Sequence, residues 1–388
     1  MPRMALPDLR PQALRRDPSA LLSHLRTFRL DLRFTAGIWF FSPAPSRFHA
    51  KYQSELDIRA RLDIASTLAG QGLVGLEAHY PNEINEENVE MWKTFSRQTG
   101  IRLVTVIPLL FWDAQWEFGS LSSPLPAVRA QAIERLKRSL AMNRSLDTDF
   151  AVLWPGIDGY ENPFGHDFAA YRDRFVDAVA EAMDAVPGVR IAFEPKPYEP
   201  RGRILFGLTA EGVLLGRLVE SKLRATENRR LLDEGHALVA MNPEVGHVLM
   251  GGEDLPYAFS WPLSEARLAH THWNSQPLGN YDQDLNPGVI SPEQMEAGLY
   301  ALKLAGYSGH FGIDVNPERM PVDRALRISM DAMRAAAERI ENVDHEAILH
   351  AHRHPDRSRG WLEGHLIRAR APGSIVLPSW PRPEGLGS

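Results

Sequence analysis

The sequence contains no cysteine among its 388 residues. Disulfides and thiolate-bound metals are therefore excluded, and any metal site must be built from oxygen and imidazole ligands. The chain also lacks a basic excess, because 43 Lys and Arg residues face 49 Asp and Glu residues, for a net charge of -6. Without surplus positive charge to meet phosphates, we expect no nucleic-acid partner and no membrane partner.

Long apolar runs are missing as well. No stretch approaches the roughly 20 consecutive apolar residues that cross a bilayer. Charged residues are spread through residues 1–29, whereas a secretion signal has a continuous apolar segment there. We therefore expect a cytoplasmic protein. The remaining composition, 44% hydrophobic and 24% charged, is ordinary for a globular chain.

The sequence instead alternates short apolar stretches with amphipathic ones. The apolar stretches predict eight strands, at 33–39, 73–79, 101–108, 150–155, 190–194, 237–244, 266–272 and 310–314. Helical periodicity is found at 17–25, 58–69, 85–99, 126–142, 166–186, 209–222, 227–236, 256–264, 291–306 and 322–341. Eight strands separated by helices favour an α/β fold, a TIM (β/α)8 barrel. A doubly wound open sheet is disfavoured because no glycine-rich phosphate turn follows the first strand.

This alternation divides the chain into three segments. We predict an N-terminal extension at 1–32, a catalytic barrel domain at 33–341 and a C-terminal arm at 342–388. The arm carries a basic run with three histidines, His350, His352 and His354, followed by a Pro- and Gly-rich tail. These histidines could bind a metal, but a solvated tail is the favoured interpretation. The arm would lie over the surface or on a neighbouring subunit.

Side chains that can bind metals recur where the predicted strands end. The fifth to eighth strands end on Glu194, Glu244, His272 and Asp314. All strand ends of a barrel open on one face, where the chemistry takes place. His247 follows Glu244 by three residues, and the loop after the seventh strand carries two more carboxylates, Asp282 and Asp284.

Gathered on one face, these carboxylates would repel one another unless cations lay among them. Taken singly, Asp314 could cap a helix and His272 could be a hydrogen-bonded core histidine. Their shared position in consecutive strand–helix units favours a metal centre. Oxygen-rich ligation with some imidazole suits Mg²⁺, Mn²⁺ or Co²⁺ better than a tetrahedral structural zinc.

At these residues the sequence resembles the xylose isomerase family of metal-dependent aldose–ketose isomerases. The resemblance lies in three motifs in the family's order: Phe193-Glu-Pro-Lys-Pro-Tyr-Glu-Pro-Arg-Gly202, Asn242-Pro-Glu-Val-Gly-His247 and Tyr281-Asp-Gln-Asp-Leu285. Weaker matches extend it over roughly residues 33–341. It implies an intramolecular oxidoreductase of carbohydrate metabolism that acts on a monosaccharide. Barrels of this family assemble through C-terminal arms, so a homo-oligomer, a dimer or a tetramer, is expected.

The resemblance also implies two divalent cations per subunit, with Glu244 bridging them. One cation would be bound by Glu194, Glu244, His272 and Asp314, and the other by Glu244, His247, Asp282 and Asp284. Lys196 would hydrogen-bond the substrate carbonyl oxygen and His79 would assist ring opening, so that the expected catalytic residues are His79, Lys196 and Asp284. The expected substrate-binding residues are Trp39, Phe111, Trp154 and His247, with Trp112 as a further candidate.

Three positions depart from the family pattern. A histidine, His272, replaces the aspartate of a His-x-Asp pattern, as in the related rhamnose isomerases, which points to a sugar other than xylose. Asn82 replaces the aspartate that supports the ring-opening histidine, so His79 is expected to lack its orienting carboxylate. Asn316 replaces a lysine that is usual near the eighth strand.

The reaction that these residues favour is a metal-assisted 1,2-hydride shift. Such a shift needs cations on two oxygens, a dry apolar wall and a cationic donor, and the chain supplies all three, with Lys196 as the donor. Two alternatives stay open. One is a ketose epimerase or another proton-abstracting sugar enzyme on the same barrel, and the other is a non-catalytic sugar- or metal-binding relative.

Overall fold

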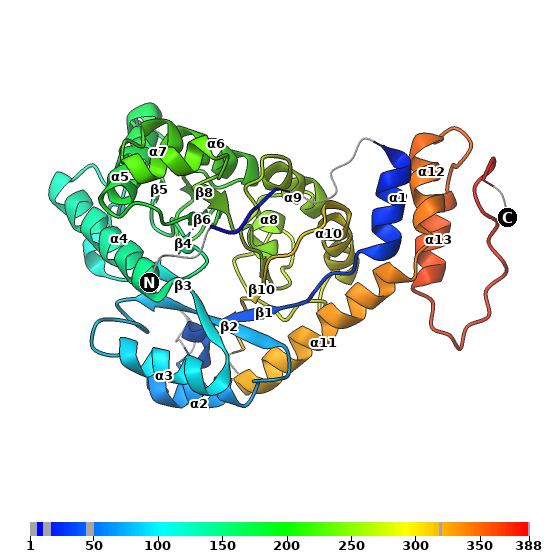
Figure 1. The fold of residues 1–388 in the computed structure, drawn as a ribbon, viewed down its shortest axis with the longest axis horizontal. Coiled ribbons are helices and arrows are strands. Elements are labelled where there is room, and N and C mark those ends of the chain that lie inside the picture. Colours follow the sequence, from blue (N-terminus) through cyan, green and yellow to red (C-terminus); the bar gives the residue numbers. More distant parts are fainter. Residues whose placement is uncertain (1–5, 11–16, 44–49, 318–319, 387–388) are drawn as a thin grey trace.

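The structure is a computed structural model and describes residues 6–10, 17–43, 50–317 and 320–386 (Figure 1). Its central strands run parallel and occur along the chain where the sequence predicts them. They are β1 (Phe34–Gly37), β2 (Leu73–Tyr80), β3 (Arg102–Pro108), β4 (Ala151–Leu153), β6 (Ile191–Phe193), β8 (Val239–Met241), β9 (His272–Trp273) and β10 (Phe311–Ile313).

These strands follow one another in the order of a (β/α)8 barrel. One ladder runs β3-β2-β1-β10-β9 and a second runs β4-β6-β8. Parallel bridges pair Met241 with Leu268 and Glu244 with His272, which joins β8 to the seventh strand. On the other side, the N–H of Asp149, just before β4, donates to the carbonyl of Val104 in β3 at 3.2 Å. The predicted α/β barrel is thus confirmed.

Helices lie around the strands, most of them within a few residues of the predicted bounds. They are α2 (Ile58–Ser66), α3 (Val89–Thr99), α4 (Pro126–Leu146), α5 (Phe168–Ala185), α6 (Thr209–Lys222), α7 (Thr226–Asp233), α9 (Leu255–Ser264), α10 (Pro292–Ala305) and α11 (Val322–Glu341). Local signals explain their starts, since the side chains of Asp57, Asp167 and Asp254 accept N–H bonds at the beginning of α2, α5 and α9.

Within the barrel segment, three short elements and one pair of short strands were not expected from the sequence. The 3₁₀ turns are η1 (Ile38–Phe41) and η2 (Ala114–Trp116), and the short helix is α8 (Val245–Met250). An antiparallel pair, β5 (Gly159–Tyr160) and β7 (Arg203–Ile204), joins two loops beyond the barrel strands. The start of α8 makes the predicted strand 237–244 too long, because the ladder ends at Met241 and Glu244 immediately precedes the helix.

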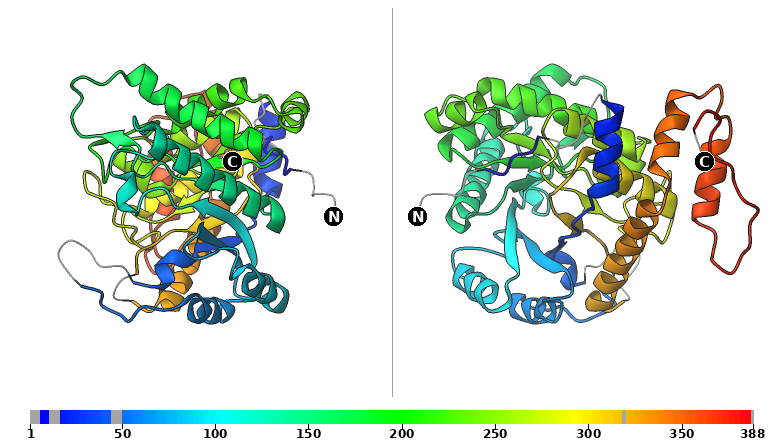
Figure 2. Two further views of the ribbon diagram at one scale, coloured as in Figure 1. Left: turned by 90° about the vertical axis from the view of Figure 1, so that its left-hand side faces the viewer. Right: turned by 45° about the vertical axis from the view of Figure 1, so that its right-hand side comes forward.

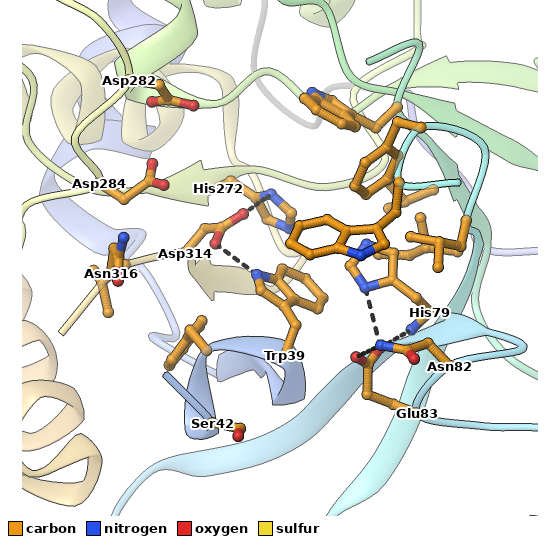
Figure 3. A pocket seen from close by; sticks show the side chains of 18 of the residues that line it. Trp39, Ser42, His79, Asn82, Glu83, His272, Asp282, Asp284, Asp314 and Asn316 are labelled. Atoms are coloured by element: carbon orange, nitrogen blue, oxygen red, sulfur yellow. Dashed lines mark hydrogen bonds and ion pairs between the residues drawn. The ribbon is translucent and has the colours of Figure 1, made fainter. Parts of the chain in front are cut away.

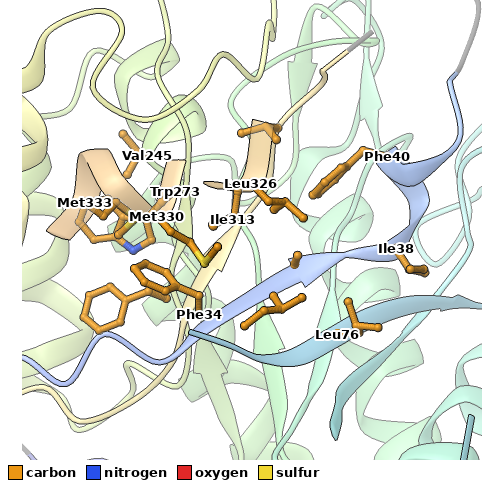
Figure 4. Packing of buried hydrophobic residues seen from close by; sticks show 14 of the residues in the cluster. Phe34, Ile38, Phe40, Leu76, Val245, Trp273, Ile313, Leu326, Met330 and Met333 are labelled. Carbon is orange, nitrogen blue, oxygen red and sulfur yellow. The ribbon is translucent and has the colours of Figure 1, made fainter. Parts of the chain in front are cut away.

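The apolar core is divided between the two halves of the barrel. Figure 4 shows one part, in which Phe34 of β1, Leu76 of β2 and Ile313 of β10 pack with Leu326 and Met330 of α11. A second cluster packs β4, β6 and β8 against α4, α5 and α6.

A helix near the N-terminal end packs against a helix near the C-terminal end, beside the barrel (Figures 1 and 2). Helix α1 (Pro18–Thr27) contacts both α10 and α12 (His345–Arg353), and Arg26 forms an ion pair with Glu346 at 2.9 Å. A further helix, α13 (Trp361–Ala369), follows α12, and the Trp361 indole donates to Pro381 O at 2.7 Å. The segment that we expected to be an arm therefore contains two helices of nine residues each. Across the described ranges, no helix is long and apolar enough to span a bilayer.

Candidate metal centre and active site

A cavity of about 560 Å³ opens beyond the carboxyl ends of the barrel strands (Figure 3). Every side chain that the sequence analysis assigned to the site lines this cavity: Trp39, His79, Phe111, Trp154, Glu194, Lys196, Glu244, His247, His272, Asp282, Asp284 and Asp314. The loops that follow the strands of a barrel deliver side chains to one face, which explains this convergence.

The first group of possible metal ligands comes from four consecutive strands. Ligand atoms of Glu194, Glu244, His272 and Asp314 all lie within 4.8 Å of one another. His272 Nδ1 lies 3.1 Å from Glu194 Oε2 and 3.3 Å from Asp314 Oδ2. The side-chain amide of Asn242 donates to the same oxygen of Glu194 at 2.7 Å and fixes that carboxylate. This group contains the full set of residues predicted for one cation.

A second group shares Glu244 with the first. Ligand atoms of Glu244, His247 and Asp282 lie within 4.8 Å of one another. His247 reaches both carboxylates because it lies on the first turn of α8, with Nδ1 3.4 Å from Glu244 Oε2 and Nε2 3.1 Å from Asp282 Oδ2. Asp284 lies outside this group, although Asn274 connects it to the site by donating to Glu244 Oε1 and to Asp284 Oδ1, both at 2.8 Å.

Burial and mutual repulsion shift the pKa values of the carboxylates in the site. Burial raises the pKa of Glu244 well above its usual value, and the charges of Asp282 and Asp284 raise it further. The pKa of Asp284 is raised well above its usual value for the same reasons, first by burial and then by Asp282 and Asp314. Burial would also raise the pKa of Asp282, but His247 and Lys196 outweigh it and lower that pKa.

Unsatisfied polar atoms show how the site fits divalent cations. Within the part of the chain that the structure describes, His272 Nδ1, His247 Nδ1 and Asp282 Oδ1 are buried without a hydrogen-bond partner. Buried polar atoms normally have such a partner. A cation in each group would contact these atoms and relieve the repulsion between the carboxylates. Oxygen and imidazole donors of this kind suit Mg²⁺, Mn²⁺ or Co²⁺.

Glu77 is a residue of the site that was not expected from the sequence. It is fully buried on β2, and its carboxylate accepts from Nε2 of His270 at 2.9 Å and from Nε2 of His272 at 3.0 Å. Burial would raise the pKa of Glu77, but the charges and hydrogen bonds of the two histidines hold it well below its usual value. The available signal was a single glutamate inside the apolar stretch 73–80.

An aromatic wall lies across the cavity from the carboxylates. The ring centroids of Trp39 and His79 are 4.6 Å apart. The ring centroid of Phe111 lies 5.7 Å from that of His79 and 4.4 Å from that of Trp154. The Trp39 indole also donates to Asp314 Oδ1 at 3.3 Å, which connects the wall to the first ligand group. Trp112, the further candidate, is 71% exposed and therefore lies at the mouth of the cavity.

The expectation that His79 lacks an orienting carboxylate is wrong. Glu83 Oε2 accepts from His79 Nδ1 at 3.1 Å and from the His79 backbone N–H at 2.8 Å. Asn82, which we had compared with the family's aspartate, instead donates to Glu83 Oε1 at 2.7 Å. The turn after β2 thus brings residue 83, not residue 82, against the imidazole.

Lys196 lies between the second ligand group and the aromatic wall. Its Nζ is 2.9 Å from Asp282 Oδ2, 3.3 Å from Glu199 Oε2 and 5.2 Å from the centre of the Trp154 ring. Burial would lower the pKa of Lys196, but Asp282 and Glu199 outweigh it and raise that pKa, so the ammonium stays charged. Asn316, the third departure, also lines the cavity, and its backbone N–H donates to Asp284 O at 2.8 Å.

Comparisons with known proteins agree with this geometry. The chain is 28% identical to the xylose isomerase of Thermus thermophilus over 272 residues, which cover 66% of this chain and 65% of that protein. It is 29% identical over the same length, with the same coverage, to the xylose isomerase of Thermus caldophilus. The match thus spans about 65% of the length of these curated relatives.

Solved structures show the same fold at lower identity. A D-tagatose 3-epimerase-like protein matches with a TM-score of 0.56 and 15% identity, over 80% of this chain and all of that chain (100%). The D-psicose 3-epimerase of Clostridium cellulolyticum H10 matches with a TM-score of 0.56 and 17% identity, over 79% of this chain and 99% of that one. The family model described as "Xylose isomerase-like TIM barrel" matches residues 66–354, and the chain therefore belongs to this family.

Proposed function

We propose that the protein is a divalent-metal-dependent isomerase that interconverts an aldose and a ketose. The observation that carries this proposal is the sharing of Glu244 between two adjacent ligand groups, with the ammonium of Lys196 2.9 Å from the second of them. The similarity to two proteins named xylose isomerase supports it. The substrate that we propose is a monosaccharide.

The ligand groups assign residues to two cations. Glu194, Glu244, His272 and Asp314 would hold one, and Glu244, His247 and Asp282 would hold the other, with Asp284 at the edge of the second group. When bound, the cations polarise the two substrate oxygens on neighbouring carbons. Because Glu244 belongs to both groups, its carboxylate would contribute to holding both cations.

The remaining side chains prepare the sugar and stabilise its charge. His79, oriented by Glu83, can give a proton to the ring oxygen and so assist ring opening. Lys196 donates to the carbonyl oxygen as negative charge develops there. Trp39, Phe111 and Trp154 exclude water from the reacting carbons.

In the isomerisation itself, the hydrogen on C2 moves with its electron pair to the carbonyl carbon C1. The proton of the C2 hydroxyl moves to the C1 oxygen, so a ketose forms without any outside oxidant or reductant. We assign this proton transfer to Asp284, which shares the amide of Asn274 with Glu244.

Chelation followed by metal addition tests the proposal. We expect exhaustive removal of metal to abolish isomerisation, and addition of Mn²⁺, Co²⁺ or Mg²⁺ to restore it for at least one pentose, hexose or 6-deoxyhexose. Full activity after metal removal, or no turnover of any sugar with any of these ions, would contradict the proposal.

A ketose epimerase is the second candidate function. One observation favours it: the first ligand group is complete by itself, whereas Asp284 lies outside the second group. One cation flanked by carboxylates is sufficient to remove a proton beside a carbonyl. Reaction in deuterated water separates the two candidates, because proton abstraction brings solvent deuterium onto carbon and a hydride shift does not.

A further inference from the structure

We infer that Glu77 is a positioning residue of the candidate metal centre, which holds the His272 ring so that Nδ1 faces the first cation. The inference rests on the proposed function, because it requires a cation bound by His272. Glu77 lies on β2 and His272 on β9, and β1 and β10 separate these strands in the sheet. The contact therefore crosses the barrel interior.

The two nitrogens of His272 have different surroundings. Nε2 lies 3.0 Å from Glu77 Oε2, whereas Nδ1 lies 3.1 Å from Glu194 Oε2 and 3.3 Å from Asp314 Oδ2. An ionised carboxylate can only accept hydrogen bonds, so the nitrogen that faces Glu77 must carry its proton. When a cation is bound, the lone pair of the imidazole is then on Nδ1, the nitrogen that faces the first ligand group.

Glu77 is itself held firmly. Its other oxygen, Oε1, accepts from Thr35 Oγ1 at 2.7 Å and from His270 Nε2 at 2.9 Å. Donors from β1 and from the seventh strand thus fix the carboxylate on two sides. Neither Glu77 nor His270 is exposed to solvent (both 0%), so water does not replace these bonds. His270 supports Glu77 without belonging to either proposed cation group.

The backbone of β10 at Gly312 packs against His272, His270 and Glu77. A Cβ atom on Gly312 would lie 2.6 Å from His272 Cδ2, 2.7 Å from His270 Nε2 and 3.0 Å from Glu77 Oε1. All three side chains therefore lie directly against the β10 backbone, and only a glycine allows this approach. A buried anion that accepts from a ligand imidazole also makes the imidazole a stronger donor to the metal.

Mn²⁺ binding to the metal-stripped protein tests the inference, with calorimetry as the readout. In Glu77→Gln the amide can accept from one imidazole but must direct its NH₂ group toward the other. We expect the site that contains His272 to bind Mn²⁺ about 10- to 100-fold more weakly than in the wild type, the loss typical for such partners. Circular dichroism should show an unchanged fold.

Glu220→Gln is the matched control. Glu220 is also a buried glutamate, but it accepts from Arg267 Nη2 at 2.6 Å and from the Leu238 N–H at 2.8 Å, and it does not line the cavity. This control should lose thermal stability yet bind Mn²⁺ like the wild type. A general weakening of the barrel would lower Mn²⁺ affinity in both variants, whereas a positioning role lowers it only in Glu77→Gln.

Nitrogen NMR of the wild type loaded with Mg²⁺ gives a readout that needs no variant. With ¹⁵N-labelled histidine, His272 should carry its proton on Nε2, and a proton on Nδ1 would overturn the inference. If Glu77→Gln does not fold, Glu77→Asp takes its place. Its side chain is one methylene shorter, so the carboxylate no longer reaches His272, and Mn²⁺ binding should be weaker than in the wild type. Wild-type affinity in the folded variant overturns this inference alone, whereas a wild-type protein that binds no divalent cation overturns the proposed function as well.

Discussion

His79 and Glu83 form a pair at the end of β2, in which the imidazole Nδ1–H donates to the carboxylate at 3.1 Å. Burial would raise the pKa of Glu83, but the hydrogen bond and charge of His79 lower it, so the carboxylate stays ionised. The backbone N–H of His79 donates to the same oxygen at 2.8 Å. The ring is therefore held with Nε2 available to the cavity.

Replacing this carboxylate should affect ring opening more than binding. We expect Glu83→Gln to lower kcat for a cyclic aldose by about 10²-fold, the lower range for a misplaced acid–base group, with little change in KM. Steady-state kinetics measure both. Asn82→Ala should change kcat far less, and equal losses in the two variants would show that the pair does not act through Glu83.

Lys196 is expected to stabilise charge on the substrate carbonyl. Lys196→Met should lower kcat by about 10²- to 10³-fold, as the loss of one donor to a developing oxyanion typically does. Lys196→Arg should not restore activity, because a planar guanidinium cannot occupy the same position beside Asp282 and Trp154. Near-normal turnover in Lys196→Met would remove the residue from the mechanism.

We expect the number of bound cations to depend on Asp282. In Asp282→Asn the first ligand group stays intact, since it does not include this residue, whereas the second loses a carboxylate. Mn²⁺ titration followed by electron paramagnetic resonance should then find one tight site instead of two. Two tight sites in the variant would contradict the assignment, and one site already in the wild type would favour the epimerase.

Metal binding and pH should be coupled in a predictable direction. In the folded, metal-free protein, burial and neighbouring carboxylates raise the pKa values of Glu244 and Asp284. Both groups therefore keep their protons at pH values where they would be ionised in the unfolded chain. Groups with a raised pKa bind more protons folded than unfolded, so the metal-free protein should lose stability as pH rises above about 4.5, the usual value for glutamate.

Added Mn²⁺ should reverse this loss, because the cation takes the place of the protons. Its stabilisation reaches about 2.7 kcal/mol at a concentration of one hundred times Kd, and at a fixed Mn²⁺ concentration it should grow between pH 5 and pH 7.5 as affinity rises. Thermal unfolding with and without Mn²⁺ measures it. A Tm shift that shrinks with rising pH would contradict the charge distribution described above.

Gly312→Ala tests the close packing of β10 against the site. The added methyl would meet three buried side chains at 2.6 to 3.0 Å, so we expect a loss of about 1–3 kcal/mol, as for other overpacked cores. Mn²⁺ affinity should fall too, because His272 is displaced. Gly373→Ala is the control, since no atom lies within 4 Å of its added methyl. Equal unfolding curves for the two variants would contradict this packing.

The barrel and its ligand face could be predicted because they depend on periodicity. Apolar stretches alternate with helical ones, and each strand delivers the residue that follows it to the same face, so Glu194 and Asp314 meet although far apart in sequence. The positions at which the strands end were predicted less accurately. Residue 244 belongs to the start of a helix because α8 begins at Val245, and no local pattern had indicated that helix.

The partners of the site residues could not be predicted, because they depend on contacts across the barrel. Glu77 meets His272 only through the barrel interior, and from the sequence alone it is one charged residue inside an apolar strand. The choice of Glu83 over Asn82 depends on the conformation of a single turn. The C-terminal helices were not predicted, because the basic run and the Pro- and Gly-rich tail indicated an irregular segment. Helix α12 packs on α1, a contact between residues far apart in the sequence.

The two walls of the cavity come from separate halves of the chain. Trp39, His79, Phe111 and Trp154 all precede residue 155, whereas the carboxylates and histidines of both cation groups follow residue 193. Mutations that reshape recognition of the sugar can therefore accumulate in the first half while the ligands in the second half stay unchanged. Relatives that keep the same metal ligands can therefore differ in the monosaccharide that they bind.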